Sequence, residues 1–351
     1  MARSAKTYAL VAGIIAAIVV TVMAFAAFAN LPRSPDEPKS TLRIAVVTDA
    51  LFSDKGWGES ALKAANFIES RYGFEVATED NVSIADIEST LKKYAQSGYD
   101  LIVAHGVQWG ASALRVGDQY PNVRIVVFTG LVKSENVASI FPQQQQGSFL
   151  LGALAGMMTK TNIIGYVGGE EYPNVVNIFE GYKQGAKAVN PDVKIVGTYL
   201  NDWDNPAKGK EAATSIIRQK VDIVFHVADS SGQGVIESAR QNGVYALGAV
   251  QDQNSLAPDT VLSSFVLDVD KAYGQAVNST LEGSLKGDIR KPGIEAEKGA
   301  AGDGIVYIAS FHDLDSKVPA SVKARLLELT TDLLSGKIVV PERLEETSPP
   351  T

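Results

Sequence analysis

Short runs of apolar residues alternate with longer segments of helical periodicity along most of the chain. Such a run, bounded by turn residues, is typical of a strand buried on both faces of a parallel sheet. Strands are predicted at residues 42–49, 74–78, 100–106, 124–130, 137–142, 162–169, 194–202, 222–229, 245–252, 261–268 and 304–310. Helices are predicted at residues 58–72, 84–96, 111–119, 147–159, 175–189, 206–219, 232–242, 268–285 and 320–334. This alternation predicts an α/β fold with doubly wound parallel sheets, and 351 residues are enough for two lobes.

The N-terminal segment has a different pattern. Arg3 and Lys6 precede an uncharged run at residues 7–28, long enough to cross a bilayer at about 1.5 Å per residue. Residues 1–29 therefore form either a cleaved signal peptide or a retained membrane anchor, and the length of the run favours the anchor. Residues 30–41 contain three prolines and are expected to form an extended linker, and residues 346–351 a polar tail. The body is expected on the extracytoplasmic face of the cell membrane, because the positive side stays cytoplasmic.

Composition and motifs exclude several kinds of chemistry. The formal net charge of -8 gives no reason to expect nucleic acid or an anionic membrane surface as a partner. The chain has no cysteine, which excludes disulfides, thiolate metal sites, a cysteine nucleophile and a lipid-modified N-terminal cysteine. The dinucleotide, Walker, zinc-protease and serine-hydrolase motifs are missing from the sequence, and it has only three histidines. We therefore expect no enzyme activity, no cofactor and no metal.

Aspartates follow four of the predicted strands. Asp49, Asp229 and Asp252 each close an apolar run, and Asp202 and Asp204 follow a fourth. In open α/β sheets, ligands bind beyond the carboxyl ends of the strands. Aspartate is also a common turn and helix-capping residue, so each of these positions has a structural alternative. As a set, they indicate the polar rim of a binding cleft.

Two tryptophans lie in loops of the same kind, one in each half of the chain. Trp57 follows Ser53 and Asp54 after the first strand, and Trp203 lies in the second half. Aromatic faces on opposing lobes can hold a flat ring, and carboxylates suit sugar hydroxyls. Packing within the loops is the structural alternative for both tryptophans. His105, at the end of the third predicted strand, is a further candidate for lining the cleft.

Several long motifs, in order, resemble the basic membrane protein family of solute receptors, which includes bacterial purine-nucleoside-binding lipoproteins. The resemblance covers residues 42 to about 341 and rests on VTDALFSDKGWGESALKAA, NVASIFPQQQQGSFLLGALAGMMTKTNIIGYVGG, EGYKQGAKAVNPDVKIVGTYLNDWDNPAKGKEAA and DIVFHVADSSGQGVIESARQNGVYALGAVQDQNSLAPDTVLSS. It implies a type I periplasmic-binding-protein fold, with two lobes joined by three chain crossings. The implied lobes are residues 42–142 plus about 258–287, and residues 143–257 plus about 288–345.

The resemblance also implies permease subunits of an ABC importer as partners, and a small-molecule ligand held between the lobes. By position, Trp57 and Trp203 match the residues that sandwich the base of the ligand. Asp49 and Asp252 match polar positions around the ligand, with Asp252 toward the ribose, and Asp229 matches less closely. These residues are therefore expected to bind a nucleoside-like molecule.

Two residues of the chain depart from the pattern of that family. Gly58 stands where the family commonly has an amide side chain, and Leu267 where a lysine is frequent. Both departures weaken the case for an unmodified nucleoside as the ligand. The leading hypothesis is a tethered receptor with a purine nucleoside as its first candidate ligand. The alternatives are a receptor for another flat heterocycle, such as a purine base or a flavin, or for a sugar; a hydrolase that uses paired aspartates; and a ligand sensor.

Overall fold

The computed structural model describes residues 41–344 of the chain. The predicted anchor at residues 1–29, all but the last residue of the predicted linker, and the tail at residues 346–351 lie outside these residues. From Leu42 onward the chain forms one compact unit. Within residues 41–344, no helix has both the length and the apolar character that a membrane crossing requires.

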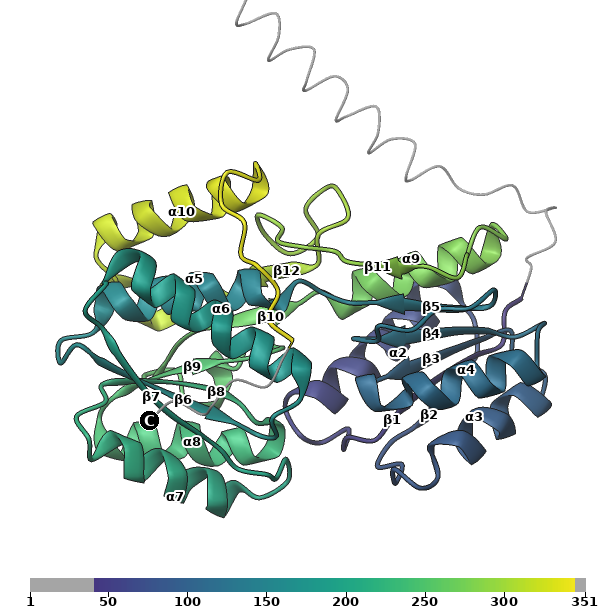
Figure 1. The fold of residues 1–351 in the computed structure, drawn as a ribbon, viewed down its shortest axis with the longest axis horizontal. Coiled ribbons are helices and arrows are strands. Elements are labelled where there is room, and N and C mark those ends of the chain that lie inside the picture. Colours follow the sequence, from purple (N-terminus) through teal and green to yellow (C-terminus); the bar gives the residue numbers. More distant parts are fainter. Residues whose placement is uncertain (1–40, 345–351) are drawn as a thin grey trace, which may run out of the picture. The chain divides into compact units, whose positions relative to one another are not determined.

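Two six-stranded sheets form the framework of this unit, each with helices on both faces (Figure 1). The first sheet has the order β11 (Ile289–Arg290), β5 (Val137–Ile140), β4 (Arg124–Phe128), β3 (Leu101–His105), β1 (Ile44–Thr48) and β2 (Val76–Glu79). The second has the order β12 (Val306–Ile308), β10 (Val261–Leu267), β9 (Tyr245–Gly248), β8 (Ile223–Val227), β6 (Ile163–Gly168) and β7 (Lys194–Tyr199). The predicted doubly wound α/β fold with two sheets is therefore confirmed.

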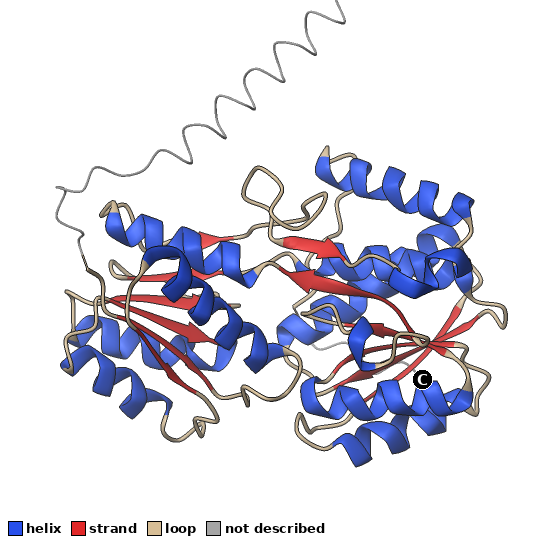
Figure 2. Cartoon of the chain, turned by 180° about the vertical axis from the view of Figure 1, so that it is seen from behind, coloured by secondary structure: helices blue, strands red, loops and turns tan. Residues whose placement is uncertain are grey.

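The helices pack in pairs on the sheet faces (Figures 1 and 2). On the first sheet, α2 (Trp57–Tyr72) pairs with α9 (Val269–Leu281) on one face, and α3 (Ile87–Gln96) with α4 (Gly110–Gln119) on the other. On the second, α5 (Gln144–Met158) pairs with α6 (Pro173–Val189), and α7 (Pro206–Ile217) with α8 (Asp229–Asn242). The last helix, α10 (Ala320–Leu334), packs on α5. Both faces of each sheet are thus covered, and five strands, β1, β3, β5, β8 and β10, are buried along their whole length.

Helices α5 and α6 approach each other at glycine. A Cβ atom at Gly152 would lie 1.9 Å from the carbonyl oxygen of Tyr182, and one at Gly185 would lie 1.8 Å from that of Phe149. Real atoms never approach so closely, so the two backbones meet at positions where any side chain would force them apart. This close contact sets the position of α6, whose first turns form one wall of the site described below.

The chain passes between the sheets three times. It leaves the first sheet after β5, returns after β10 to form α9 and β11, and leaves again to form β12. Strand β10 pairs with β9 and β12, so the second crossing follows Leu267 rather than residue 258. Likewise, β11 pairs with β5, so the third crossing follows Arg290 rather than residue 287.

Two strands of the sheets differ from the expected pattern. Strand β11 has two residues, too few for an apolar run to reveal it, and no strand was predicted there. Strand β12 pairs with β10 in the antiparallel direction, at one edge of the second sheet. A parallel partner would need a helical crossover, whereas β12 enters from the crossing segment and runs back along β10.

Candidate functional site

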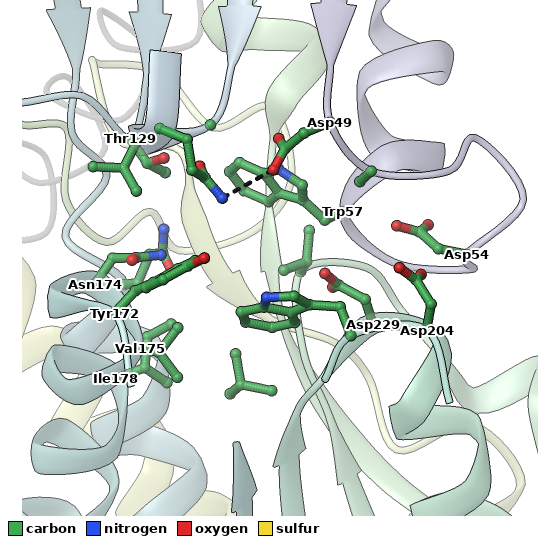
Figure 3. Close-up of a pocket in the computed structure, with 18 residues that line it drawn as sticks. Asp49, Asp54, Trp57, Thr129, Tyr172, Asn174, Val175, Ile178, Asp204 and Asp229 are labelled. Atoms are coloured by element: carbon green, nitrogen blue, oxygen red, sulfur yellow. Dashed lines mark hydrogen bonds between the residues drawn. The ribbon is translucent and has the colours of Figure 1, made fainter. Parts of the chain in front are cut away.

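A pocket lies between the carboxyl ends of the strands of the two sheets (Figure 3). It contains about 720 Å³ of space, part of which is open to solvent. Its 18 lining residues are Asp49, Ala50, Asp54, Trp57, Gly106, Val107, Gln108, Thr129, Gln144, Tyr172, Asn174, Val175, Ile178, Trp203, Asp204, Val227, Asp229 and Val250. Its lining combines apolar and aromatic side chains with a few polar groups, as is typical of sites for small organic molecules.

The loops that follow parallel strands supply most of this lining, and helices α2, α5, α6 and α8 supply most of the rest. Strands β1, β3 and β4 of the first sheet lead to Asp49, Gly106 and Thr129, respectively. In the second sheet, β6, β7, β8 and β9 also lead directly into lining residues. The pocket therefore lies where ligands bind in open α/β folds, at the carboxyl edge of both sheets.

Trp57 lines the pocket from the first residue of α2, and a buried column of rings supports it. Its ring centroid lies 3.8 Å from that of His105 and 5.6 Å from that of Phe128. The His105 Nε2 atom lies 3.1 Å from the Trp57 carbonyl oxygen, and Nδ1 lies 2.6 Å from the Tyr273 hydroxyl. A carbonyl only accepts, so the neutral ring donates from Nε2 and accepts the tyrosine hydrogen at Nδ1. His105 is fully buried and fixes Trp57 from behind.

Trp203 lines the pocket from the second lobe and lies against the backbone of Gly169. A Cβ atom at Gly169 would come within 2.3 Å of the indole, so only glycine leaves room for this ring. The ring of Tyr172 lies beside Trp203, with 6.0 Å between the centroids. Aromatic surfaces from both lobes therefore line one pocket.

Asp54 joins the pocket to the start of α2. Its carboxylate accepts hydrogen bonds from the backbone N–H groups of Gly56, Gly58 and Glu59, at 2.8, 2.6 and 3.1 Å. Carboxylates at this end of a helix satisfy N–H groups that lack a partner within the helix. Burial nevertheless raises the pKa of Asp54, against the effect of these hydrogen bonds.

The remaining carboxylates of the pocket are also shifted. Burial raises the pKa of Asp49, whose oxygens accept hydrogen bonds from Gln108 Nε2 at 3.0 Å and Trp109 Nε1 at 3.4 Å. Burial, and after it the repulsion of Asp202, raises the pKa of Asp204. The pKa of Asp229 is raised well above its ordinary value by burial and then by the carboxylates of Asp54 and Asp204. The lining thus holds four carboxyl groups, and the surroundings of each favour its protonated form.

Three glutamines of the second lobe hold the loop that precedes α2. The Nε2 atoms of Gln233, Gln251 and Gln253 donate to the backbone carbonyl oxygens of Asp54, Gly56 and Lys55, at 3.1, 2.7 and 3.1 Å. These hydrogen bonds bring the loop that carries Trp57 against the second lobe. The pocket is therefore closed on this side by contacts between the lobes.

Five of the eight residues predicted for the site line the pocket: Asp49, Asp54, Trp57, Trp203 and Asp229. The structure does not bring Ser53, His105 and Asp252 to it. Ser53 is exposed at the surface of the loop, and His105 lies beneath Trp57. Asp252 is partly exposed, and its Oδ2 lies 2.6 Å from His312 Nε2. Val250, two residues earlier, takes the pocket position expected for Asp252, because β9 already ends at Gly248.

Sequence reasoning missed most of the polar residues that do not carry a charge. Tyr172 and Asn174 follow β6, and Gln108 and Thr129 follow β3 and β4. Gln144 begins α5, just after the chain leaves the first sheet. A signal for the loop residues was available, since each follows a predicted strand at the same edge as Asp49. Aspartate and tryptophan stood out, whereas these residue types are common in any loop.

His226, in β8, is buried, and its ring nitrogens have no hydrogen-bond partner within the described part of the chain. Burial lowers its pKa to about 4, so the folded protein holds the ring neutral, whereas the unfolded chain takes up a proton near pH 6.5. The free energy of unfolding should therefore fall as the pH is lowered from about 6.5 toward 4. In urea titrations, we expect His226→Leu to reduce this slope by up to about 1.4 kcal/mol per pH unit. A variant that keeps the parent slope would contradict the assignment of this pH dependence to His226. Buried His105 is still present in the variant and accounts for any slope that remains.

The groups in the pocket define what it can do. It offers aromatic faces, carboxylates and amides, which suit recognition of a small polar ring system. Among residues 41–344, no group of three or more histidine, aspartate or glutamate side chains is placed to hold a metal ion. The lining contains no serine, cysteine, lysine or histidine, so no nucleophile lies beside a base of these types.

The sequence matches one protein family and several known proteins. Residues 41–298 match the family model Bmp, described as ABC transporter substrate-binding protein PnrA-like. The chain is 28% identical over 310 residues to basic membrane protein A of Borreliella burgdorferi, which covers 86% of this chain and 88% of that protein. It is 28% identical over 288 residues to a purine-binding protein of Brucella abortus, covering 81% and 79%. It is also 29% identical over 236 residues to transcriptional activator protein med of Bacillus subtilis, covering 67% and 74%.

Solved structures show the same fold. An ABC transporter solute-binding protein of Aeropyrum pernix matches with a TM-score of 0.76 and 22% identity, covering 86% of this chain and 94% of that one. A transcriptional activator of the comK gene from Bacillus halodurans matches with a TM-score of 0.70 and 26% identity, covering 84% and 98%. The type I periplasmic-binding fold implied by the sequence motifs is therefore confirmed.

Proposed function

The chain belongs to the Bmp family, the PnrA-like substrate-binding proteins of ABC transporters, and from this membership we propose that it receives a nucleoside-like ligand. A purine nucleoside is the first candidate. One observation carries the proposal: Trp57 and Trp203 come from different lobes and line the same pocket. A base between two indoles gains roughly 1 to 3 kcal/mol from stacking. The name of the Brucella abortus relative, a purine-binding protein, supports a purine as the base.

The polar groups of the pocket supply the contacts for the rest of such a ligand. Asp49 accepts from hydroxyl groups, and its neighbour Gln108 offers an amide within the same wall. Thr129 and Tyr172 add hydroxyl groups. Release and capture follow from hinge motion of the lobes, and the glutamine contacts with the loop before α2 would form on closure.

We also propose partners for the receptor and a mode of attachment to the membrane. Permease subunits of an ABC importer are its partners, and the apolar run at residues 7–28 tethers the binding body on the extracytoplasmic face of the membrane. Tethering by this run replaces the lipid that a cysteine would carry. The sequence itself supports this part of the proposal.

A ligand sensor is the second candidate, because relatives of this chain include proteins named transcriptional activators. In this alternative, the closed receptor signals to a partner protein instead of delivering ligand to a permease. Deletion of the importer subunits separates the two functions. A transporter-linked receptor loses uptake, whereas a sensor keeps its response to ligand.

Ligand identification tests the proposed function directly. Small molecules that copurify with the full chain are released by denaturation and identified by mass spectrometry. Adenosine, guanosine, adenine, riboflavin and ribose are then titrated by calorimetry and tryptophan fluorescence. We expect one nucleoside per chain, recovered intact. Preference for ribose or riboflavin would contradict the nucleoside assignment, and release of free base would indicate a hydrolase.

A further inference from the structure

The wall of the pocket carries charge of one sign. Four carboxylates line it, from Asp49, Asp54, Asp204 and Asp229, and none of its 18 lining residues is lysine, arginine or histidine. None of these four carboxylates takes part in an ion pair with another residue in the range 41–344. Asp54 is buried and Asp49 and Asp229 are partly buried, whereas Asp204 is exposed. Burial favours the protonated form of such carboxyl groups, and a cation on the ligand would favour the ionised form instead.

Three of these carboxylates gather at one end of the pocket. Figure 3 shows Asp54, Asp204 and Asp229 on one side, with Tyr172 and Asn174 on the opposite side. Asp229 belongs to the second lobe but lies against the first, since a Cβ atom at Gly56 would be 3.2 Å from its Oδ1. Closing the lobes therefore brings the carboxylates of Asp54 and Asp229 toward each other. Their mutual repulsion raises the pKa of Asp229 further.

The aromatic rings of the pocket favour the same sign of charge in the occupant. The π faces of tryptophan and tyrosine are negative and attract cations, by about 0.5 to 2 kcal/mol per contact. Trp57, Trp203 and Tyr172 all line the pocket, and the ring centroids of Tyr172 and Trp203 are 6.0 Å apart. A flat cation would gain from stacking and from charge in one position.

A separate observation points to hydrogen-bond donors on the occupant. The Oδ1 atom of Asn174, in the wall opposite Asp229, is buried and has no hydrogen-bond partner in the described chain. A buried acceptor of this kind costs about 1 to 3 kcal/mol unless a donor reaches it. The pocket thus presents acceptors at both ends, which a ligand with N–H or O–H groups would satisfy.

We propose that the ligand of this pocket is a cationic heterocycle, a nucleoside-like molecule whose base carries a positive charge beside Asp54, Asp204 and Asp229. The proposal rests on the proposed function and makes its ligand class more specific. A neutral purine nucleoside would gain the stacking but leave three carboxylates facing one another. A charged base compensates them and binds the negative faces of Trp57 and Trp203.

An isomeric pair of nucleosides tests the sign of the charge. At pH 7, 1-methyladenosine carries a positive charge on its base. N6-methyladenosine differs only in the position of the methyl group and is neutral. We expect calorimetry on the full chain to show at least tenfold tighter binding of 1-methyladenosine. Equal or tighter binding of the neutral isomer would overturn the proposal while leaving the nucleoside assignment intact.

A second pair, 1-methylnicotinamide and nicotinamide, separates the charge from the nucleoside. If neither nucleoside binds but the cationic nicotinamide binds at least tenfold tighter than the neutral one, the cation proposal stands and the nucleoside assignment fails. Absence of binding by all four compounds at millimolar concentration would overturn both. The result for this pair therefore distinguishes the two failures.

Variants and pH locate the charge. We expect Asp229→Asn to abolish the preference for 1-methyladenosine, and asparagine tolerates the positive φ of 42° at this position. Asp270→Asn is the matched control, because Asp270 lies outside the pocket lining and faces Lys298 at 3.4 Å; the affinity of this variant should stay within twofold of the parent. Affinity for the cation should rise with pH as the carboxyl groups of Asp49, Asp54, Asp204 and Asp229 ionise, because the pKa of each is raised and the cation favours the ionised form. The opposite trend, tighter binding at low pH, would show that a protonated carboxyl donates to a neutral ligand and would overturn the proposal.

Discussion

Replacement of Trp57 or Trp203 by alanine is expected to weaken ligand binding by about 1 to 3 kcal/mol each, which is roughly 5- to 150-fold in the dissociation constant. Each indole lines the pocket from its own lobe, so each change removes one face of the clamp. Calorimetry with the copurified ligand measures the loss. Trp57→Phe and Trp203→Phe keep an aromatic face and should recover most of the affinity. If both alanine variants bind like the parent, the clamp is wrong.

A variant that leaves both indoles in the chain gives an independent check. The Trp203 ring lies on Gly169, where a Cβ atom would come within 2.3 Å of it. Gly169→Ala must therefore displace the ring, and we expect a loss of affinity similar to that of Trp203→Ala. Circular dichroism and thermal unfolding show whether the fold survives. A folded Gly169→Ala variant with parent affinity would mean that the position of the Trp203 ring does not matter for binding.

The sheets could be predicted because their strands are buried on both faces. Strands β1, β3 and β8 are buried at every residue, so each is a largely apolar run in the sequence. The same burial explains where prediction fails. Strand β11 has two partly buried residues, and its place in the first sheet depends on pairing with β5, which is distant in sequence.

The site could be predicted as far as its place at the strand ends, but not in its finer choice of residues. Val250 has a positive φ of 68°, so the chain turns sharply after β9 and directs Val250, not Asp252, to the pocket. No local pattern announces that turn, since a β-branched residue rarely adopts this conformation. His105 ends its strand like a lining residue, yet Trp57 covers it. Both differences from the expected lining arise from backbone turns and contacts that no local sequence pattern announces.

The structure explains why residue 58 is glycine, where the family commonly has an amide side chain. A Cβ atom there would lie 2.2 Å from the carbonyl oxygen of Leu51. The glycine therefore permits the tight loop in which Asp54 accepts three backbone hydrogen bonds. A missing amide at this position follows from the path of the loop, and ligand preference must be set by other residues, of which the carboxylates are the most distinctive.

Loss of Lys271, a residue of α9 that binds the segment between β11 and β12, should destabilise the protein by about 3 to 5 kcal/mol. Lys271 Nζ lies 2.8 Å from Glu295 Oε2 and donates to the carbonyl oxygens of Ala300 and Gly304, at 2.8 and 2.7 Å. These groups belong to the segment between β11 and β12, where the chain crosses from the first sheet to the second. Lys271→Met would leave the Glu295 carboxylate, 3% exposed, without its cation. Urea titration measures the change in the free energy of unfolding.

A double variant and an exposed pair make this prediction specific. Lys271→Met with Glu295→Met should recover most of the lost stability, because the uncompensated charge is gone. Lys298→Met, which removes an exposed partner 3.4 Å from Asp270, should change stability by less than about 1 kcal/mol. Burial already raises the pKa of Glu295, and loss of Lys271 should raise it further. In the single variant, Glu295 therefore keeps its proton to higher pH in the folded protein than in the unfolded chain. The stability deficit of this variant should thus be larger at pH 8 than at pH 5, and a deficit independent of pH would mean that lost packing, not charge, is responsible.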